Sequence, residues 1–337
     1  MTLSMAQKDK RVKRRKATAG SAASAAIATS PAVTAAYVSP ALVGMLLFNV
    51  FPILYTAYMA FTNRNGPKHF ADGKYSLNGI SNDNPLLDNF GRILGEPDFY
   101  LVVGRTLLYT VVCVTLFFCV GLVFAHILNH QGIKFKGVWR TLMILPWAVP
   151  TFVTALIWKF LFHAQFGPIN QMLALIGIQG PQWLNNGVTA FIAIIIVNLW
   201  MSFPYFTLVL LGGLQSIPND VYEASSMDGA NFWRQLFAIT LPLLRPVAVP
   251  AIILSAIQTF GALHLNTVRL LTDGGPITRA NQPGATELLL LWAYHQGFNQ
   301  SRLFGVVGAL AVIIFILMLI ATLAATRVTR ATRAAYE

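Results

Sequence analysis

Six apolar stretches, each long enough to cross the hydrocarbon layer of a bilayer, run through this chain of 337 residues. A transmembrane helix needs about 20 apolar residues, and in lipid the backbone groups of such a segment must bond within it. The stretches cover residues 38–61, 100–128, 138–162, 188–213, 246–266 and 303–326. We therefore predict an all-α fold, a polytopic membrane helical bundle of about six transmembrane helices. A shorter apolar segment, 286–298, carries Glu287 and His295 and is predicted to be an interfacial helix.

The amount and distribution of charge agree with a membrane protein. Only 11% of the residues are charged, against about a quarter in soluble domains. The net charge is +12, and seven of the 24 basic residues lie in residues 8–16, before the first span. A basic tail in that place is typical of a topology signal or a contact with anionic membrane lipid. No basic face interleaved with aromatic residues accompanies the tail, which argues against nucleic-acid binding.

The first span does not have the form of a cleaved signal peptide. An Ala/Ser/Thr-rich stretch, residues 17–36, separates the basic residues from the apolar core. That core is longer than the roughly 7–15 apolar residues of a signal peptide, so we predict that the span is retained. The two cysteines, Cys113 and Cys119, both fall inside the second span. They imply neither a disulfide framework nor a metal site.

Lysine and arginine lie mostly on one side of the predicted spans, which sets the expected orientation. That side holds both termini, and the excess of basic residues places it in the cytoplasm, so a multi-pass membrane protein with both termini inside the cell is expected. The expected organisation is a cytoplasmic tail (1–36), a first transmembrane helix (37–62), an extracytoplasmic loop (63–98), a core (99–326) that contains a cytoplasmic loop (215–241), and a second cytoplasmic tail (327–337).

Prolines interrupt three consecutive predicted spans. Pro146 and Pro150 lie in the third, Pro204 lies in the fourth, and Pro246 and Pro250 lie at the start of the fifth. A broken helix in lipid frees backbone groups, which is tolerated mainly where protein or a watery cavity supplies partners. Kinks that only shape packing are the alternative for any single proline. The clustering favours a translocation path through these three helices.

The segment between the fourth and fifth spans carries the most specific motif in the chain. It fits the pattern E-A-(A/S)-x3-G-x9-I-x-L-P at Glu223, Ala224, Ser225, Gly229, Ile239, Leu241 and Pro242. Asn219 or Asp220 is expected to cap a short helix here, and Gly229 to let the chain turn close against a partner. An ordinary surface loop is the alternative, but residue types and spacing agree over twenty residues.

This motif resembles the cytoplasmic loop of permease subunits in binding-protein-dependent ATP-binding-cassette importers. The resemblance implies the type I ABC importer permease fold. It also implies that the motif residues form a loop that docks on an ATPase and couples to it. The partners implied are a second permease subunit, a dimer of ATP-binding-cassette ATPase subunits and an extracytoplasmic sugar-binding protein.

Three further stretches narrow the resemblance. Residues 269–276 resemble the outer loop of carbohydrate permeases, and residues 144–152, together with 166–170, resemble the larger permease subunit of maltose importers. The likeness covers the chain from about Tyr37 to Arg330. Two departures stand out: the enteric maltose subunit has two additional N-terminal helices, and it has a large folded domain where this chain has only the loop 63–98.

The chain is expected to be a transport subunit and not an enzyme. It contains no G-x-x-x-x-G-K-[ST] sequence to cradle ATP phosphates, so hydrolysis would belong to a partner chain. No catalytic residues, cofactor or metal site are predicted. The inner parts of the spans hold almost no ionisable side chains, which argues against an ion-coupled carrier because such carriers keep intramembrane charges.

The expected substrate is a neutral sugar. Sugar recognition needs amides, hydroxyls and aromatic rings at mid-depth, and the candidates are Trp147, Ser202, Tyr205, Gln258 and His264, together with Asn198, Trp200 and Thr259. Tyr205 follows Pro204 and matches an aromatic position that resembles the sugar site of the maltose subunit. The fifth span matches that site poorly, with Gly261 and His264 where asparagines are expected. Hydrogen bonding between helices is the alternative role for each polar residue taken singly.

These observations predict a permease for maltose- or maltodextrin-like oligosaccharides. Within the same class, an importer of another polyol, such as trehalose or glycerol phosphate, is the alternative. From a different class, the alternative is a secondary sugar carrier, which would need no ATPase partner.

Overall fold

The computed structural model describes residues 31–66, 75–80, 83–261, 265–277, 282–298 and 302–334. In these parts the chain is helical and contains no extended strand, only isolated bridges, so the predicted all-α class is confirmed. The helices of eight or more residues are α2 (Pro31–Met45), α3 (Phe51–Met59), α5 (Asp88–Gly95), α6 (Pro97–Asn129), α7 (Lys136–Ala148), α8 (Thr151–Leu161), α9 (Pro168–Leu175), α10 (Gly187–Gln215), α11 (Asn219–Met227), α13 (Leu241–Phe260), α14 (Leu265–Thr272), α15 (Leu289–Phe298) and α16 (Phe304–Ala334). Three shorter helices are η1 (Leu46–Val50), α12 (Phe232–Gln235) and η2 (Leu236–Thr240). The basic tail lies outside the described residues.

Five helical segments among the described residues are long and apolar enough to cross a membrane. They are Val33–Met59, Pro97–Asn129, Gly187–Gln215, Phe232–Phe260 and Phe304–Ala324. The pair α7 and α8 passes the same test together, and counting it as one span gives six. The number of spans therefore agrees with the prediction, although one of them is not a continuous helix.

The third predicted span, 138–162, is broken into α7 and α8, which meet at 91°. The break falls at Val149, which has extended backbone angles (φ −74°, ψ 130°), and at Pro150. A proline disfavours the helical conformation in the residue before it, so Pro150 ends α7 at Ala148. Pro146 lies inside α7.

The fifth span starts earlier than the predicted boundary at Pro246. Asn231 caps a helix that runs without a break through α12, η2 and α13, since its side chain accepts a hydrogen bond from the amide of Arg234 at 2.9 Å. The expected loop 215–241 is consequently shorter, and Pro246 and Pro250 lie within α13. The predicted interfacial helix 286–298 is α15, which begins at Leu289.

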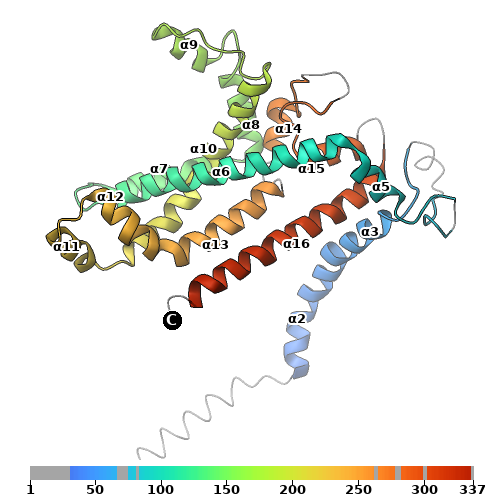
Figure 1. Ribbon diagram of the computed structural model, residues 1–337, viewed down its shortest axis with the longest axis horizontal. Helices are drawn as coiled ribbons and strands as arrows, with labels where there is room; N and C mark the ends of the chain where they lie inside the picture. Colours follow the sequence, from blue (N-terminus) through green and yellow to red (C-terminus); the bar gives the residue numbers. More distant parts are fainter. Residues whose placement is uncertain are drawn as a thin grey trace, which may run out of the picture. The chain divides into compact units, whose positions relative to one another are not determined.

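The chain divides into two compact units, Met1–Tyr58 and Met59–Glu337. The described part of the first is a single helical rod, in which the wide π-turn η1 lies just before Pro52. A π-turn shifts the hydrogen-bonding register, which helps a proline to be placed within an otherwise continuous helix. Figure 1 shows the rod and the helices of the second unit, whose mutual placement is not fixed.

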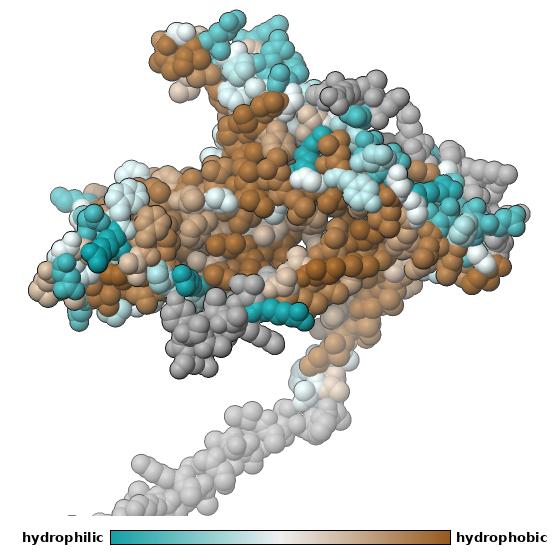
Figure 2. Space-filling model, viewed as in Figure 1, coloured by the Kyte–Doolittle hydropathy of each residue, from teal (hydrophilic) through white to brown (hydrophobic). Residues whose placement is uncertain are grey.

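The core of the second unit forms where α6 packs along α10 and α13. Gly121 of α6 lies directly against Phe206 of α10, and a Cβ added there would meet the Cβ of Phe206 at 2.5 Å. Small residues of this kind let membrane helices approach closely. A second cluster joins α5 and α6 to α15 and α16, with Trp292 and Leu310 among its buried members. Within the second unit, apolar side chains cover α6, α13 and α16, and hydrophilic side chains gather beside α11 and beside α5 (Figure 2).

Candidate functional site

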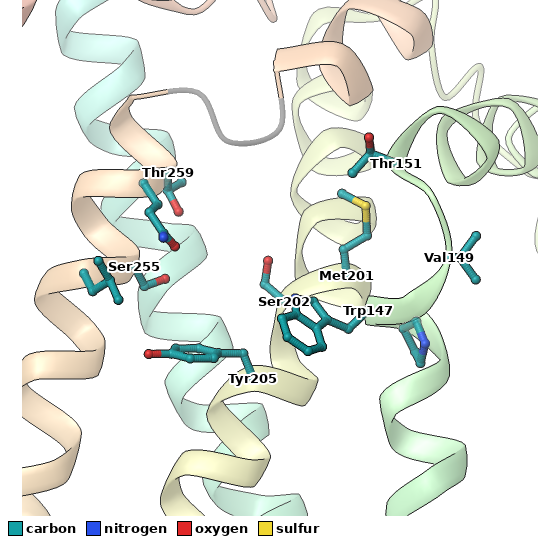
Figure 3. Close-up of a pocket in the computed structure, with 11 residues that line it drawn as sticks. Trp147, Val149, Thr151, Met201, Ser202, Tyr205, Ser255 and Thr259 are labelled. Carbon is teal, nitrogen blue, oxygen red and sulfur yellow. The ribbon is translucent and has the colours of Figure 1, made fainter. Parts of the chain in front are cut away.

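A cavity of about 330 Å³ opens between the break of α7 and α8 and the helices α10 and α13. Three proline-interrupted segments thus meet at one hollow. The described residues that line it are Pro146, Trp147, Val149, Thr151, Met201, Ser202, Tyr205, Leu254, Ser255, Gln258 and Thr259. Figure 3 shows Ser202 and Tyr205 of α10 pointing towards Ser255 and Thr259 of α13.

The cavity wall combines neutral polar groups with apolar surface. Hydroxyls come from Thr151, Ser202, Tyr205, Ser255 and Thr259, and an amide comes from Gln258. None of the described lining residues carries a charge. Hydroxyls and amides can both donate and accept hydrogen bonds, so the wall matches a neutral ligand that bears many hydroxyls and has apolar ring faces.

Four of the five residues predicted for the substrate path line this cavity. They are Trp147, Ser202, Tyr205 and Gln258, which are brought together from α7, α10 and α13. The fifth, His264, lies outside the described residues. Thr259 also lines the cavity.

Two further candidates serve packing between helices. Asn198 is buried and donates to the hydroxyl of Tyr109 on α6 at 2.9 Å. Its Oδ1 accepts from Ser202 Oγ at 3.3 Å, so it also helps to orient a cavity residue. Trp200 packs edge-on against Trp158, with ring centroids 6.0 Å apart. Asn198 and Trp200 therefore make contacts between helices, which was the alternative role considered for the polar residues of the spans.

Sequence reasoning missed Thr151 and Ser255 as lining residues. Ser255 lies three residues before Gln258 and four before Thr259, so all three fall on one face of α13. That spacing could have revealed it. Thr151 could not be found this way, because its position depends on the bend between α7 and α8.

The motif between α10 and α13 forms the short helix α11 and a tight turn. Pro218 occupies the position before α11, and no side chain makes a capping bond there, so the expected cap at Asn219 or Asp220 is wrong. At the other end, the amide of Ala230 bonds to the carbonyl of Ser225 at 3.0 Å, and that of Gly229 to Ser226 at 3.1 Å. This is the Schellman arrangement, which requires a left-handed residue after the helix. Gly229 supplies it with φ +77°.

The seven motif residues fall on three successive elements. Glu223, Ala224 and Ser225 lie on α11, Gly229 lies in the turn, Ile239 lies in η2, and Leu241 and Pro242 open α13. Glu223, Ala224 and Gly229 are exposed. Large apolar side chains are exposed beside them, including Met227, Trp233 and Phe237. The face of α11 and α12 therefore combines a carboxylate with apolar surface.

Three side-chain contacts that the motif did not predict hold α11 to the following helix. Gln235 Nε2 donates to Ser225 Oγ at 3.0 Å and to Ser226 Oγ at 2.9 Å. The hydroxyls of Tyr222 and Thr240 lie 3.0 Å apart. These bonds make α11 and the start of the long helix one connected element.

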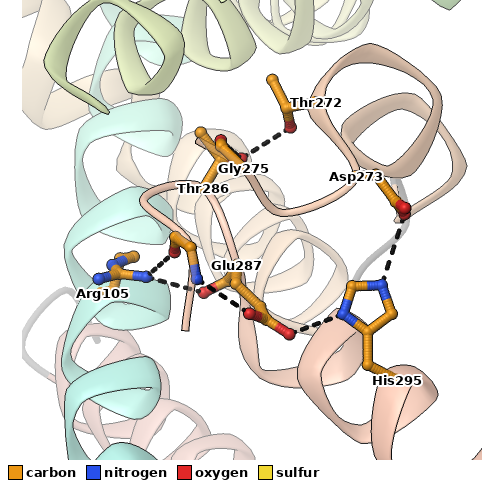
Figure 4. A network of polar contacts seen from close by, with 8 residues as sticks. Arg105, Thr272, Asp273, Gly275, Thr286, Glu287 and His295 are labelled. Atoms are coloured by element: carbon orange, nitrogen blue, oxygen red, sulfur yellow. Dashed lines mark hydrogen bonds and ion pairs between the residues drawn. The ribbon is translucent and has the colours of Figure 1, made fainter. Parts of the chain in front are cut away.

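A polar network fixes the segment between α14 and α15, which lies in the second unit away from α11 (Figure 1 and Figure 4). Arg105 of α6 donates to the carbonyl of Gly284. His295 Nδ1 lies 2.7 Å from Glu287 Oε1, and its Nε2 lies 3.4 Å from Asp273 Oδ1. The network holds Glu287 and His295 as structural partners, and no group of side chains suited to a metal ion occurs among the described residues.

Residues 118–334 match the protein family described as "Binding-protein-dependent transport system inner membrane component". The chain is 40% identical over 235 residues to the maltose/maltodextrin permease MalF of Klebsiella aerogenes, which covers 67% of this chain and 45% of the relative. It is 37% identical over 229 residues to the trehalose/maltose permease MalF of Thermococcus litoralis, and the match covers 67% of this chain and 73% of that relative. It is 34% identical over 279 residues to GanP, the galactooligosaccharide permease of Bacillus subtilis, and this match covers 81% of this chain and 64% of GanP. The chain thus spans about half the length of the Klebsiella relative.

A solved bacterial ABC transporter involved in the import of the acidic polysaccharide alginate has a similar fold. One of its chains superposes with a TM-score of 0.71 at 18% identity, over 88% of this chain and 95% of that chain. The predicted type I importer permease fold is confirmed.

Proposed function

The chain belongs to the family of binding-protein-dependent transport system inner membrane components, and we infer from this membership that it is the permease subunit of an ATP-driven sugar importer. Its relatives are permease subunits, membrane components and not enzymes. The partners in this proposal are a second permease subunit, a dimer of ATP-binding-cassette ATPase subunits and an extracytoplasmic sugar-binding protein. Both termini would lie in the cytoplasm of a bacterial cell, with the helices in its inner membrane.

The uncharged polar cavity is the observation that supports a sugar as substrate. Its hydroxyls and amide suit the hydroxyls of an oligosaccharide, and Trp147 and Tyr205 can face the apolar sides of sugar rings. A maltose- or maltodextrin-like oligosaccharide is the preferred substrate, because two of the reported relatives carry maltose in their names. Trehalose and galactooligosaccharides are the next candidates by the same reasoning.

Glycerol phosphate fits the cavity less well than a neutral sugar. A phosphate taken out of water needs a paired cation or several strong donors. The described cavity wall offers no lysine or arginine.

Coupling to the ATPase is assigned to the exposed face of α11. The exposed carboxylate of Glu223 makes no hydrogen bond or ion pair within the described part of the chain, so it is available to a cation on a partner. The turn at Gly229 has open space around it, which leaves room for a docking surface. The bonds from Gln235 would pass a displacement of α11 to the long helix that ends at the cavity.

Uptake of labelled sugars tests this function in a strain that lacks the chromosomal gene for this chain. We expect the full chain, expressed with its partner subunits, to support uptake of maltose or maltotriose, and unlabelled competitors to rank trehalose, galactooligosaccharide and glycerol phosphate behind them. Uptake that persists without any ATPase subunit would instead identify a secondary carrier. Uptake of glycerol phosphate alone would contradict the assignment of a neutral sugar.

A further inference from the structure

A second cavity, of about 400 Å³, lies where α5 joins α6 and meets α15 and α16. It shares no lining residue with the cavity between α7, α10 and α13. Its floor is apolar and includes Ile93, Trp292 and Val306. Its polar side chains are Arg92 and Glu96, at the junction of α5 and α6, and Gln296 of α15. No part of the proposed transport cycle uses this pocket.

The polar groups of this pocket are not used by the rest of the described chain. Arg92 pairs with Asp88 through Nε at 2.9 Å, and its two terminal amino groups have no partner among the described residues. The same holds for the carboxylate of Glu96 and the side-chain amide of Gln296. A cation that Asp88 already engages on one side, an anion and a neutral amide therefore line one pocket, and the terminal amino groups of Arg92 are the part of the cation left for a ligand.

The pocket lies at the ends of two span-length helices. Glu96 directly precedes α6, Leu303 directly precedes α16, and Val306 lies in the first turn of α16. The beginning of a membrane helix lies at the headgroup level of the bilayer, where tryptophan is also enriched. Tyr100 and Leu101, in the first turns of α6, are exposed and would meet acyl chains below the pocket.

We propose that this pocket binds the headgroup of a zwitterionic phospholipid that carries a primary ammonium, as phosphatidylethanolamine does. The terminal amino groups of Arg92 would receive the phosphate in a forked, charge-assisted contact. Glu96 would accept hydrogen bonds from the ammonium, which a short ethanolamine link holds beside the phosphate. Gln296 would bond to the ester region or the phosphate.

This chemistry separates the proposed ligand from other candidates. An anionic headgroup without an ammonium would leave Glu96 beside a second negative charge, which disfavours binding. The quaternary ammonium of phosphatidylcholine has no N–H to donate to Glu96. The pocket offers a sugar no exposed tryptophan ring to stack on, since Trp292 is only 7% exposed.

Native mass spectrometry of the full chain, delipidated in detergent with its accompanying subunits, tests the proposal. Phosphatidylethanolamine, phosphatidylglycerol and phosphatidylcholine with identical acyl chains are titrated, and the bound fraction is measured. We expect the ethanolamine lipid to bind most tightly. Arg92→Gln and Glu96→Gln should each weaken its binding by about tenfold, the effect of losing one hydrogen bond to a charged group.

Lys134→Gln and Asp83→Asn serve as matched controls, because they remove one charge of each sign from exposed positions outside the pocket. Equal binding of the three lipids would overturn the proposal. So would variants that bind like their controls, or displacement of the lipid by maltose. If Arg92→Gln does not fold, Glu96→Gln and the comparison of the three headgroups decide the question. Sugar uptake is not part of the readout, so the result is independent of the proposed transport function.

Discussion

Gln235 Nε2, on α12, lies 2.9 Å from Ser226 Oγ, on α11, and donates a hydrogen bond to it. The same amide donates to Ser225 Oγ at 3.0 Å. One side chain thus connects the short helix of the motif to the helix that runs on to the cavity. The connection joins a proposed docking surface to a proposed substrate path within one chain.

Replacing Gln235 by leucine is expected to uncouple these two parts. Each neutral hydrogen bond contributes about 1 kcal/mol, so the loss of the Gln235 bonds would leave the Tyr222–Thr240 contact to hold α11 and would let α11 move more freely against α12. We expect a several-fold lower uptake, together with ATPase activity that responds less to the loaded binding protein. Gln215→Leu, an exposed glutamine at the end of α10, is the control. Equal uptake in the two variants would show that the connection carries no coupling.

Gly229→Asn should abolish transport while the protein remains folded. The position has φ +77°, and a Cβ there would meet nothing within 4 Å in the described chain. A left-handed backbone costs a non-glycine residue about 1–2 kcal/mol, and asparagine adopts it more readily than most. The added side chain would therefore act mainly on a docked partner.

Gly177→Asn is a matched control for that variant. Gly177 has φ +78° and equally open surroundings, but it lies beyond α9. Membrane abundance and uptake are measured for both variants. Normal uptake by Gly229→Asn would mean that no partner packs closely against the turn.

Tyr205→Ala is expected to reduce uptake strongly, because the ring lines the cavity and its hydroxyl makes no bond within the described chain. Tyr205→Phe keeps the ring and loses only a hydrogen bond to the ligand, worth about 0.5–1.5 kcal/mol, or roughly two- to tenfold in affinity. ATPase activity stimulated by the loaded binding protein should survive in both variants. Normal transport by Tyr205→Ala would identify Tyr205 as a packing residue.

Asn170 is expected to hold the segment around α9 together. Its Nδ2 donates to the carbonyls of Ala164 and Pro181 at 2.9 and 3.1 Å, and its Oδ1 accepts from Trp183 Nε1 at 2.7 Å. Asn170→Ala should cost about 2–4 kcal/mol locally, from three lost bonds at about 1 kcal/mol each. Asn170→Asp should be no better, because a carboxylate would face two carbonyl oxygens. Hydrogen exchange of residues 164–186 measures the effect, and Gln179→Ala, at an exposed position of the same segment, is the control.

The sequence predicted the helical fold well because span length and hydrophobicity are local properties of the chain. It predicted the cavity in part, since Trp147, Ser202, Tyr205 and Gln258 are polar or aromatic residues near prolines in spans. It could not predict the 91° bend between α7 and α8, because a proline specifies where a helix breaks and not at what angle. Thr151 was missed for that reason.

The boundaries of the motif segment were less predictable than its residues. The fifth span was predicted to begin at Pro246, yet the helix begins at Phe232 and continues through the π-turn Leu236–Thr240 and past all three prolines, at 242, 246 and 250. Gln235 lies between motif positions, so no pattern marks it. Its role follows only from the fold of α11 back towards α12.

The uncharged wall of the cavity between α7, α10 and α13 also bears on which energy source can act on the cargo. Moving one elementary charge across a membrane potential is worth about 2.3 kcal/mol per 100 mV, but the neutral sugar of the proposed function, beside the uncharged residues of Figure 3, would carry no charge through that field. The transmembrane voltage would then neither pull the substrate inwards nor oppose it. Dissipating the voltage with an ionophore, while ATP is held constant, should leave the initial rate of uptake unchanged. The steepness of the sugar gradient would be set by ATP alone.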